Sequence, residues 1–531
     1  MKIKKFAFLI VYTVLIFFIF YIFDALLLIS GIVKSTEPYQ KTKYSGKYFL
    51  NNPAFITKYY PGVSMPDDSE PVDYLTMTPE ESVVRGFVLG GSTAQGYPDA
   101  TNNSFAKITE RILNYGDKQS IEILNLSFSG LNSFYVNDAM KKILKYKPNF
   151  IIIYAGHNEI FGTFGAASGG NIFQKKLYMS LYEINSVRWL FDLINTSENN
   201  KDLSLMNIQF AGKIFENDSK KNDVVKNNFY TNISETIALC KKNNIRVFIF
   251  DPVSNLIDMP PFKTDYPDSF IIEETQNIRD IQKLIQIKDN DMIPFRARSY
   301  ISKEIEKIAK NNDNVVYIPL FDILYSKFGV SGFGQQLFID HLHFNYTGNH
   351  EAAIVLAQSL SALYNFDFNK DLLYEKNSRM IMNYSPVCEV IASRKIRNMI
   401  ENPPYSDMTV KYNKDILFDY ENKIPLDLNE RIKNIETEEE IHNIVLAYLK
   451  EIGRIDLLVD YLKMLNSIHL SSPDSYILLS DYYSYSGDME TAEMYLTKGY
   501  LLSAERQKII KSIQEYQKKY NPAFFNKYVK N

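Results

Sequence analysis

The sequence predicts an α/β fold in which a mainly parallel sheet is covered by helices on both faces. Short apolar runs, typical of buried strands, occur at 85–90, 121–126, 149–154, 246–251 and 314–319. Helix-like stretches lie between most of these runs, at 104–115, 133–146, 232–243, 297–311 and 347–364. Alternating strands and helices indicate a parallel sheet, and strands buried on both faces are near-continuous apolar runs. We therefore expect a three-layer domain over residues 83–366.

Two connections within this domain are too long to be simple loops. Residues 160–231 separate the third and fourth strands, and residues 255–296 separate the fourth and fifth. Loops of this length are usually functional or contain elements of their own. Both follow the C-terminal end of a strand, so they could form a lid or a wall of a site, or be plain decoration.

The region from 367 to 531 lacks strand signals and is predicted to be helical. Gly453 and Gly487 are 34 residues apart, which is the period of tetratricopeptide repeats. The second unit has the large, apolar and small positions of that pattern, at Tyr476, Leu479, Tyr483, Gly487, Ala492, Leu496 and Gly499. We expect repeats at about 439–472 and 473–506, which could dock a protein partner. A plain helical bundle with a chance spacing is the alternative.

The N-terminus has the features of a membrane anchor. Lysines precede an apolar run over 6–23, and a second apolar stretch over 25–33 follows Asp24. A run of this length can span a bilayer, and it exceeds the apolar core of a typical cleaved signal peptide. We expect a single-pass, uncleaved signal anchor over 1–34 with a cytoplasmic N-terminus, because basic residues stay inside. An irregular lead-in over 35–82 would connect this anchor to an extracytoplasmic domain.

Composition excludes several classes of protein. The 531 residues have a net charge of −3, which gives no electrostatic footprint for nucleic acid. Two cysteines, Cys240 and Cys388, form neither a disulfide framework nor a metal-binding pattern. A single bridge between them stays open.

Four polar segments lie at the C-terminal ends of the predicted strands or in the loops beyond them. They are Gly90-Gly91-Ser92-Thr93, Asn125 to Gly130, Tyr154 to Glu159, and Asp340 to His343. The C-terminal ends of parallel strands share an edge, and open α/β sheets hold their ligands there. We therefore expect these four segments to converge on one site.

The residue types in these segments suit acyl transfer. A serine hydroxyl such as that of Ser92 becomes a nucleophile when a histidine takes its proton. Asp340 lies three residues before His343, near enough to orient this imidazole. The backbone N–H groups of Ser92 and Gly130 and the side-chain amide of Asn158 could stabilise the oxyanion.

The set Ser92, Gly130, Asn158 and His343 resembles the signature of the SGNH, or GDSL-type, hydrolase superfamily. The resemblance covers roughly residues 83–366 and implies a flavodoxin-like α/β/α sandwich. It also implies a Ser92–His343–Asp340 triad, an oxyanion hole from Ser92, Gly130 and Asn158, and esterase, lipase or thioesterase chemistry without a metal or other cofactor. The anchor, the Gly-His-Asn-Glu motif at 156–159 and the trailing helices are similar to a bacterial membrane-anchored subgroup.

The sequence departs from the family pattern at two positions. Gly91 replaces the aspartate that usually precedes the nucleophile, and Glu159 replaces the usual final aspartate of the third motif. Both changes leave the catalytic atoms in place and bear on the substrate. Residues that could contact the substrate are His157, Glu159, Asn255 and His341. His341 could also be the base in place of His343, and an Asp with two His could suggest a metal site, although no fourth ligand is visible.

These observations predict a membrane-anchored extracytoplasmic serine hydrolase that removes an acyl group, such as acetyl, from a glycan, an envelope component or a small ester. An O-acyltransferase would use the same triad with a hydroxyl acceptor. A protein of another class, a non-catalytic assembly protein acting through its helical C-terminal region, is a second hypothesis. A lipase at the bilayer surface is a third.

Overall fold

The computed structural model describes residues 2–42, 47–60, 73–116, 120–194, 205–210, 212–268, 271, 280–367, 369–408, 410, 417–503 and 505–524. At its centre is a five-stranded parallel sheet in the order β5-β4-β6-β7-β8. The strands are β4 (Val84–Gly90), β5 (Ile121–Asn125), β6 (Phe150–Tyr154), β7 (Arg246–Phe250) and β8 (Val315–Ile318). This is the flavodoxin-like order, so the predicted fold class is confirmed.

Strand β4 occupies the position that matters most for the site. It pairs with β5 on one side, where Val88 aligns with Asn125, and with β6 on the other, where Val88 aligns with Ile152. The chain leaves β4 towards β5 and later returns to the opposite side at β6, so the strand order reverses between β4 and β6. Ligands of open α/β sheets bind at such a switch point.

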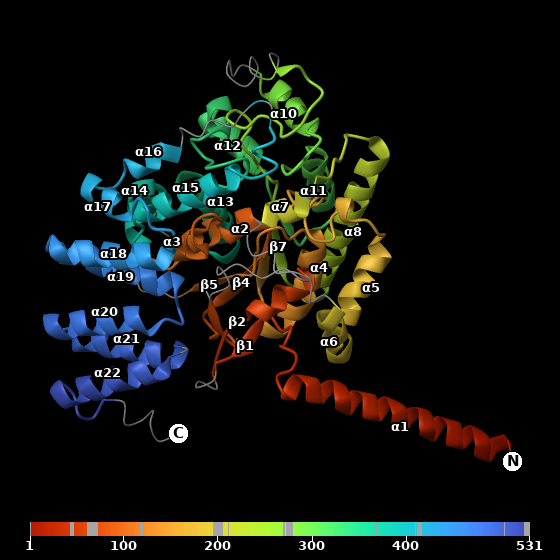
Figure 1. Ribbon diagram of the computed structural model, residues 1–531, viewed down its shortest axis with the longest axis horizontal. Helices are drawn as coiled ribbons and strands as arrows, with labels where there is room; N and C mark the ends of the chain where they lie inside the picture. The colour runs from red at the N-terminus through yellow and green to blue at the C-terminus, as the bar shows by residue number, and fades with distance from the viewer. Residues whose placement is uncertain are drawn as a thin grey trace.

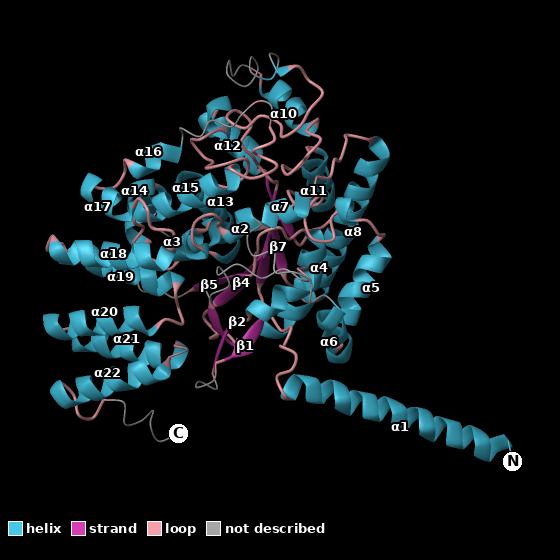
Figure 2. Ribbon diagram, viewed as in Figure 1, coloured by secondary structure: helices cyan, strands magenta, loops and turns pink. Residues whose placement is uncertain are grey.

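Helices cover both faces of the sheet (Figure 2). One face packs against α4 (Ser133–Ile143), α8 (Ser219–Lys242) and α11 (Tyr300–Lys310) through Leu89 and Ile151. The other face packs against α3 (Phe105–Leu113), α12 (Leu320–Phe328) and α13 (Tyr346–Tyr364) through Val88 and Ile152. Alternate residues of one strand thus enter opposite cores, which explains why these strands are apolar throughout.

The two long connections contain elements of their own. The first contains η5 (Ala166–Ser168), α5 (Ile172–Tyr182), α6 (Asn185–Ile194), α7 (Leu205–Phe210) and the start of α8. The second contains α10 (Ile281–Asp289). Helix α8 begins 13 residues before the predicted start at 232, because Asp218 caps it by accepting from the N–H of Lys221. Its first turns are polar and lack the apolar periodicity that marks a helix in sequence.

The lead-in differs from the irregular segment that the sequence predicts. Strands β1 (Tyr39–Lys41), β2 (Tyr48–Asn51) and β3 (Tyr74–Thr76) form an antiparallel sheet, and η1 (Pro53–Tyr59) follows β2. Buried aromatic side chains attach the lead-in to the main core, among them Tyr39, Phe55 and Tyr59. Strands of three or four residues leave almost no periodic signal in the sequence.

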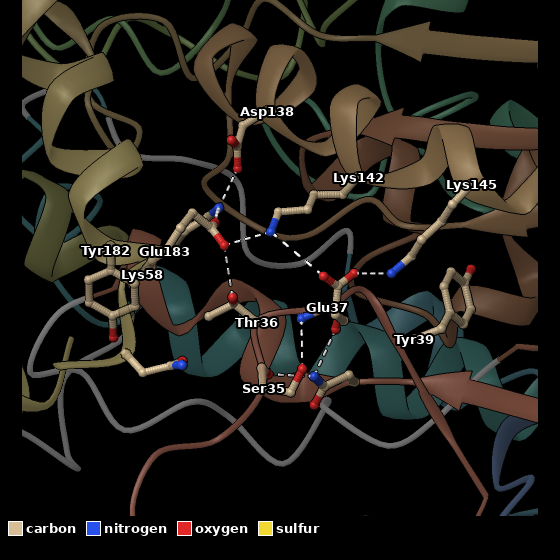
Figure 3. Close-up of polar contacts among 12 residues, drawn as sticks. Ser35, Thr36, Glu37, Tyr39, Lys58, Asp138, Lys142, Lys145, Tyr182 and Glu183 are labelled. Carbon is tan, nitrogen blue, oxygen red and sulfur yellow. Dashed lines mark hydrogen bonds and ion pairs between the residues drawn. The ribbon is translucent and has the colours of Figure 1, made fainter. Parts of the chain in front are cut away.

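A polar cluster also holds the lead-in to the domain (Figure 3). The ammonium group of Lys58 is fully buried and pairs with Asp138 of α4 and with Glu183, at 2.6 Å, at the end of α5. Glu183 also accepts from Lys142 at 2.5 Å and from the hydroxyl of Thr36 at 3.0 Å. A buried charge needs such partners, so this cluster fixes the lead-in, α4 and the end of α5 together.

The C-terminal region is helical where it is described, as predicted. After η7 (Lys370–Leu373) it comprises α14 (Glu375–Ile381), α15 (Pro386–Ile400), α16 (Phe418–Glu421), α17 (Leu426–Ile432), α18 (Glu438–Glu451), α19 (Ile455–Ile468), α20 (Pro473–Ser486), α21 (Met489–Leu502) and α22 (Arg506–Lys519). The pairs α18–α19 and α20–α21 occupy the two expected repeats. Gly453 and Gly487 adopt φ values of +70° and +88° after α18 and α20, which explains glycine at both positions. Their tetratricopeptide identity stays a prediction.

Helix α1 (Lys2–Ile29) projects from the body of the protein (Figure 1). Residues Val11–Ile29 have a mean hydropathy of 2.4, and this helix is long and apolar enough to cross a membrane. A signal sequence would meet the same criteria. The end of α1 is in contact with the domain, where Leu27 is buried.

Candidate active site

Ser92 follows β4 after the single residue Gly91 and is the first residue of the short helix α2 (Ser92–Gln95). The turn that leads to it packs closely against the loop after β6. A Cβ atom on Gly90 would lie 2.2 Å from the carbonyl oxygen of Tyr154, and one on Gly91 would lie 2.5 Å from Nδ2 of Asn158. The two glycines therefore allow the first and third polar segments to meet.

The fourth segment brings an imidazole to this serine. Nε2 of His343 lies 2.6 Å from Oγ of Ser92, and Nδ1 of His343 lies 2.5 Å from Oδ2 of Asp340. The loop is held in shape because Oδ1 of Asp340 accepts from the N–H groups of Leu342 and His343, at 2.9 and 2.7 Å. Serine, histidine and aspartate thus form a continuous hydrogen-bonded row, as the sequence predicts.

Electrostatics fix the protonation pattern of this row. Burial would raise the pKa of the fully buried Asp340, but the imidazoles of His343 and His341 hold the pKa of that carboxyl well below its usual value. The ionised carboxylate favours a proton on Nδ1 of His343. Nε2 is then free to accept the proton of Ser92, which is what activation of a serine nucleophile requires.

His341 lies on the other side of Asp340. Its Nδ1 is 3.3 Å from Oδ2 of Asp340 and 2.8 Å from the hydroxyl of Tyr405. Burial lowers the pKa of His341, although Asp340 opposes this shift. Ser92 pairs with His343, so the geometry favours His343 over His341 as the base. Tyr405 follows α15 in the C-terminal region and belongs to no motif, so nothing in the sequence pointed to it.

A small pocket lies beside Ser92 at the switch point of the sheet. The residues that line it come from the first, second and third polar segments and the loops after them: Gly91, Ser92, Thr93, Leu131, Tyr154, Ala155, Gly156, His157 and Asn158. Ser92 is 8% exposed and lines this pocket, so access to its side chain is restricted.

The candidate oxyanion donors differ in how the structure places them. Nδ2 of Asn158 donates to the carbonyl of Leu131 at 3.0 Å, which orients the amide and leaves its second hydrogen. Gly130 adopts a φ of +73°, and its carbonyl accepts from the N–H of Thr163 at 3.1 Å. Within the described part of the chain, the N–H groups of Ser92 and Gly130 have no acceptor. Ser92 and Asn158 line the pocket, whereas Gly130 directly precedes the lining residue Leu131.

His157 is a buried histidine in the pocket wall. Its Nδ1 accepts from the N–H of Ala297 at 3.0 Å, so the proton of the neutral ring is on Nε2. Burial, with His341 and His343 nearby, holds the pKa of His157 well below its usual value. Nε2 is buried and has no partner among the described residues. The N–H at Nε2 of His157 is therefore a hydrogen-bond donor without an acceptor in the described chain, as a contact to a substrate would require.

Glu159 and Asn255, also predicted as substrate contacts, lie outside the pocket lining. Glu159 is buried and accepts from the N–H and the hydroxyl of Ser133, at 2.9 and 2.7 Å, at the start of α4. The side-chain oxygen of Asn255 accepts from the backbone N–H of Asp258 at 2.9 Å. The backbone N–H of Asn255 donates to the carbonyl of His341 at 3.0 Å. Both residues hold loops in place behind the site.

Potential metal ligands also meet here, because donor atoms of Asp340, His341 and His343 lie within 4.8 Å of one another. Nδ1 of His343 and Oδ2 of Asp340, however, are 2.5 Å apart. That is a hydrogen-bond distance, and two ligands of one tetrahedral ion lie farther apart, at about 3.4 Å for metal–ligand bonds of about 2.1 Å. The arrangement therefore fits a triad better than a metal centre.

No family model matches the chain, and no curated protein matches it. Several solved structures are similar. The acetyl xylan esterase AlAXEase is 15% identical with a TM-score of 0.30, over 52% of this chain and 100% of that chain. A lipase/acylhydrolase from Enterococcus faecalis is 12% identical with a TM-score of 0.29, over 54% and 100%. The psychrotrophic esterase EstA from Pseudoalteromonas sp. is 11% identical with a TM-score of 0.26, over 53% and 98%.

The sheet order and the positions of the polar segments agree with the resemblance seen in the sequence. Ser92 follows the first strand of the parallel sheet, Gly130 the second and Asn158 the third, and His343 precedes the last helix of the domain. The chain has the flavodoxin-like α/β/α fold that this resemblance implies.

Proposed function

We propose that the protein is a serine ester hydrolase, anchored in a membrane by α1, whose domain lies outside the cytoplasm. Its substrate would be an acyl ester, such as an acetyl ester, on a glycan or another envelope component. The observation that carries this proposal is the row of contacts Ser92 Oγ to His343 Nε2, 2.6 Å, and His343 Nδ1 to Asp340 Oδ2, 2.5 Å.

In the first half of the reaction, Oγ of Ser92 attacks the ester carbonyl while Nε2 of His343 takes the hydroxyl proton. The negative charge that develops on the carbonyl oxygen would be stabilised by the side-chain amide of Asn158 and the N–H groups of Ser92 and Gly130. The C–O bond to the alcohol then breaks, and His343 returns the proton to the departing oxygen. An acyl group remains on Ser92.

In the second half, water attacks the acyl group with His343 as the base, and the acid leaves as Ser92 regains its proton. If a hydroxyl group took the place of water, the same steps would transfer the acyl group. Hydrolase and transferase are distinguished by adding a sugar acceptor and measuring how the acyl group divides between free acid and acylated sugar.

The pocket supports a short acyl chain. Ser92 is only 8% exposed, and Tyr154, Leu131 and His157 surround the space beside it. Tyr154 is itself fixed, because its hydroxyl accepts from the N–H of Val253 at 3.1 Å. Side chains this close to Ser92 favour a short acyl group such as acetyl over a long acyl chain.

The test uses the full chain in detergent with p-nitrophenyl esters of increasing acyl length and a fluorescent organophosphonate. We expect hydrolysis of the acetate, less of longer esters, and labelling that Ser92→Ala abolishes. Ser127→Ala is the matched control, because this buried hydroxyl on the neighbouring loop has no partner within the described residues. Labelling that persists in Ser92→Ala, or no hydrolysis of any ester, would overturn the proposal. The latter result would favour the non-catalytic assembly protein.

A further inference from the structure

We propose that α5 and α6 form a second contact with the membrane, beside the helix that anchors the chain. The occupant of their exposed apolar face would be the lipid bilayer that α1 enters. This inference rests on the membrane insertion of α1 included in the proposed function, and it is independent of the chemistry at Ser92.

The apolar patch consists of large side chains that point away from the domain. On α5 and α6 the exposed ones are Phe173, Leu177, Leu181, Trp189, Leu190, Leu193 and Ile194, with exposed fractions from 36% for Trp189 to 70% for Ile194. On α6 the opposite face carries Arg188, which is buried. An amphipathic helix with an exposed apolar face can lie in a membrane interface with that face towards the lipid.

The patch is continuous with α1. The ring of Trp189 on α6 lies edge-on to that of Phe23 on α1, with centroids 6.2 Å apart. The other side of α6 packs against α5, where the rings of Phe191 and Tyr178 are stacked with centroids 5.4 Å apart. Figure 1 shows α6 between α1 and α5. Tryptophan is enriched where membrane and water meet. The position of Trp189 beside the anchor is therefore the one expected of a residue at that boundary.

Asp24 sets the depth of α6 relative to the bilayer. It ends the apolar run over 6–23, and a carboxylate is costly within the hydrocarbon. Its Oδ1 accepts from the N–H and hydroxyl of Ser186 at 2.7 and 2.9 Å, and its Oδ2 accepts from Asn185 at 2.9 Å. Asp24 thus caps α6, and an anion is favourable at a helix N-terminus. Helix α6 begins where α1 leaves the hydrocarbon.

The turn between α5 and α6 is rigidly attached to the rest of the protein. The buried guanidinium of Arg188 donates to the side chain of Asn185 at 2.5 Å and to the carbonyl of Tyr182 at 3.2 Å. Glu183, in the same turn, is held by Lys58 and Lys142 (Figure 3). The apolar patch cannot fold back onto the domain without breaking these contacts, so within the described residues it stays available to a membrane.

Trp189 is the single tryptophan of the chain, so its fluorescence reports on this surface alone. The full chain is placed in phosphatidylcholine nanodiscs containing lipids brominated near the headgroup or near the bilayer centre. We expect quenching of Trp189, stronger with the shallow bromines. Leu190→Asp with Leu193→Asp should reduce this quenching at least twofold and raise quenching by aqueous acrylamide. Leu457→Asp, at an exposed apolar position on α19, is the matched control and should change neither.

A second variant moves the probe away from the anchor. In a Trp189→Phe background, Phe173→Trp places the fluorophore on α5 and should also be quenched by brominated lipid, whereas Met494→Trp on α21 should not. The thermal unfolding temperature in detergent should be unchanged in all variants, which shows that they are folded whether or not the protein hydrolyses esters. The proposal would be overturned if brominated lipid quenched neither position 189 nor position 173. It would also be overturned if the protein formed dimers in detergent and the tryptophan stayed protected from acrylamide there, because a second copy of the chain would then cover the patch.

Discussion

The hydroxyl of Tyr405 lies 2.8 Å from Nδ1 of His341, and the same nitrogen lies 3.3 Å from Oδ2 of Asp340. An anionic carboxylate at this distance favours a proton on Nδ1, which is then shared between Asp340 and the oxygen of Tyr405. Tyr405 is buried and packs edge-on against Phe262, with ring centroids 4.8 Å apart. A residue of the C-terminal region therefore helps to orient the carboxylate that orients His343.

This contact predicts that Tyr405→Phe impairs catalysis while sparing substrate binding. Without the hydroxyl of Tyr405, His341 loses a buried hydrogen bond and is free to turn away from Asp340. The carboxylate of Asp340 would then lose its contact with His341. The energy of such a bond corresponds to a reduction in kcat of up to about tenfold. KM for p-nitrophenyl acetate should stay unchanged, because Tyr405 does not line the pocket. Steady-state kinetics of the full chain measure both constants.

The C-terminal region also offers a matched control for this variant. The hydroxyl of Tyr461 lies 2.7 Å from Nδ1 of His442, in a buried pair of the same kind that is remote from the site. Tyr461→Phe should lower the melting temperature by about as much as Tyr405→Phe and leave kcat unaltered. Equal kcat in the two variants would show that Tyr405 is only structural.

Asp340→Asn should be far more damaging than a change at His341. The asparagine side chain lacks the negative charge that stabilises protonated His343. It also no longer favours the tautomer of His343 that has its proton on Nδ1. We expect kcat to fall by about 10³- to 10⁴-fold. His341→Gln should cost about tenfold or less, because this ring does not contact Ser92. If the two variants lost activity equally, the roles given to the two histidines would be wrong.

Much of the fold and of the candidate site could be predicted because the relevant signals are local. Each buried strand is an apolar run such as Phe150–Tyr154, and the first three polar segments lie at the ends of strands. The rule that parallel strands share an edge then brings Ser92 and Asn158 together without further information. The structure brings Ser92 next to His343 as well, across 251 positions of sequence.

The features that were missed depend on contacts between distant segments. The small sheet of the lead-in depends on aromatic packing of Tyr39 and Phe55 against the main core. Tyr405 reaches His341 across 64 positions, and no motif marks it. Glu159 follows Asn158 directly, yet its side chain turns to Ser133 instead of the pocket. Adjacency in a motif does not fix the direction of a side chain.

Gly91 gives a prediction for the position where the sequence departs from the family. Its φ of −92° suits any residue, so the constraint is steric: a Cβ would meet Nδ2 of Asn158 at 2.5 Å. Gly91→Ala should displace the amide of Asn158 and reduce kcat about 10²-fold, the usual cost of losing one oxyanion donor. Asn158→Ala should have a similar effect.

A double-mutant cycle separates this explanation from general damage to the turn. If both substitutions act through the same amide, the double variant should be scarcely worse than either single variant, because the donor can be lost only once. Fully additive losses would show that Gly91 acts independently of Asn158.

The environment of Glu159 makes stability depend on pH. Burial raises the pKa of this carboxyl from 4.5 to about 7, against the opposing effect of its hydrogen bonds from Ser133. Between these two values the folded state keeps a proton that the unfolded state has released. Stability contributed by this group therefore falls as pH rises from about 4.5 to about 7, and it is constant above that range.

Glu159→Gln should remove this dependence, because the amide does not ionise and its oxygen can still accept from the N–H of Ser133. At pH 5 the variant and the natural protein should have similar stability. At pH 8 the variant should be the more stable, by up to roughly 3 kcal/mol, since each pKa unit corresponds to about 1.4 kcal/mol. Thermal unfolding of the full chain in detergent at the two pH values measures the difference. Glu439→Gln, at an exposed position of α18, is the control and should leave the pH dependence unaltered. If Glu159→Gln raised the free energy of unfolding by the same amount at pH 5 and pH 8, the carboxyl of Glu159 would not have the raised pKa described above.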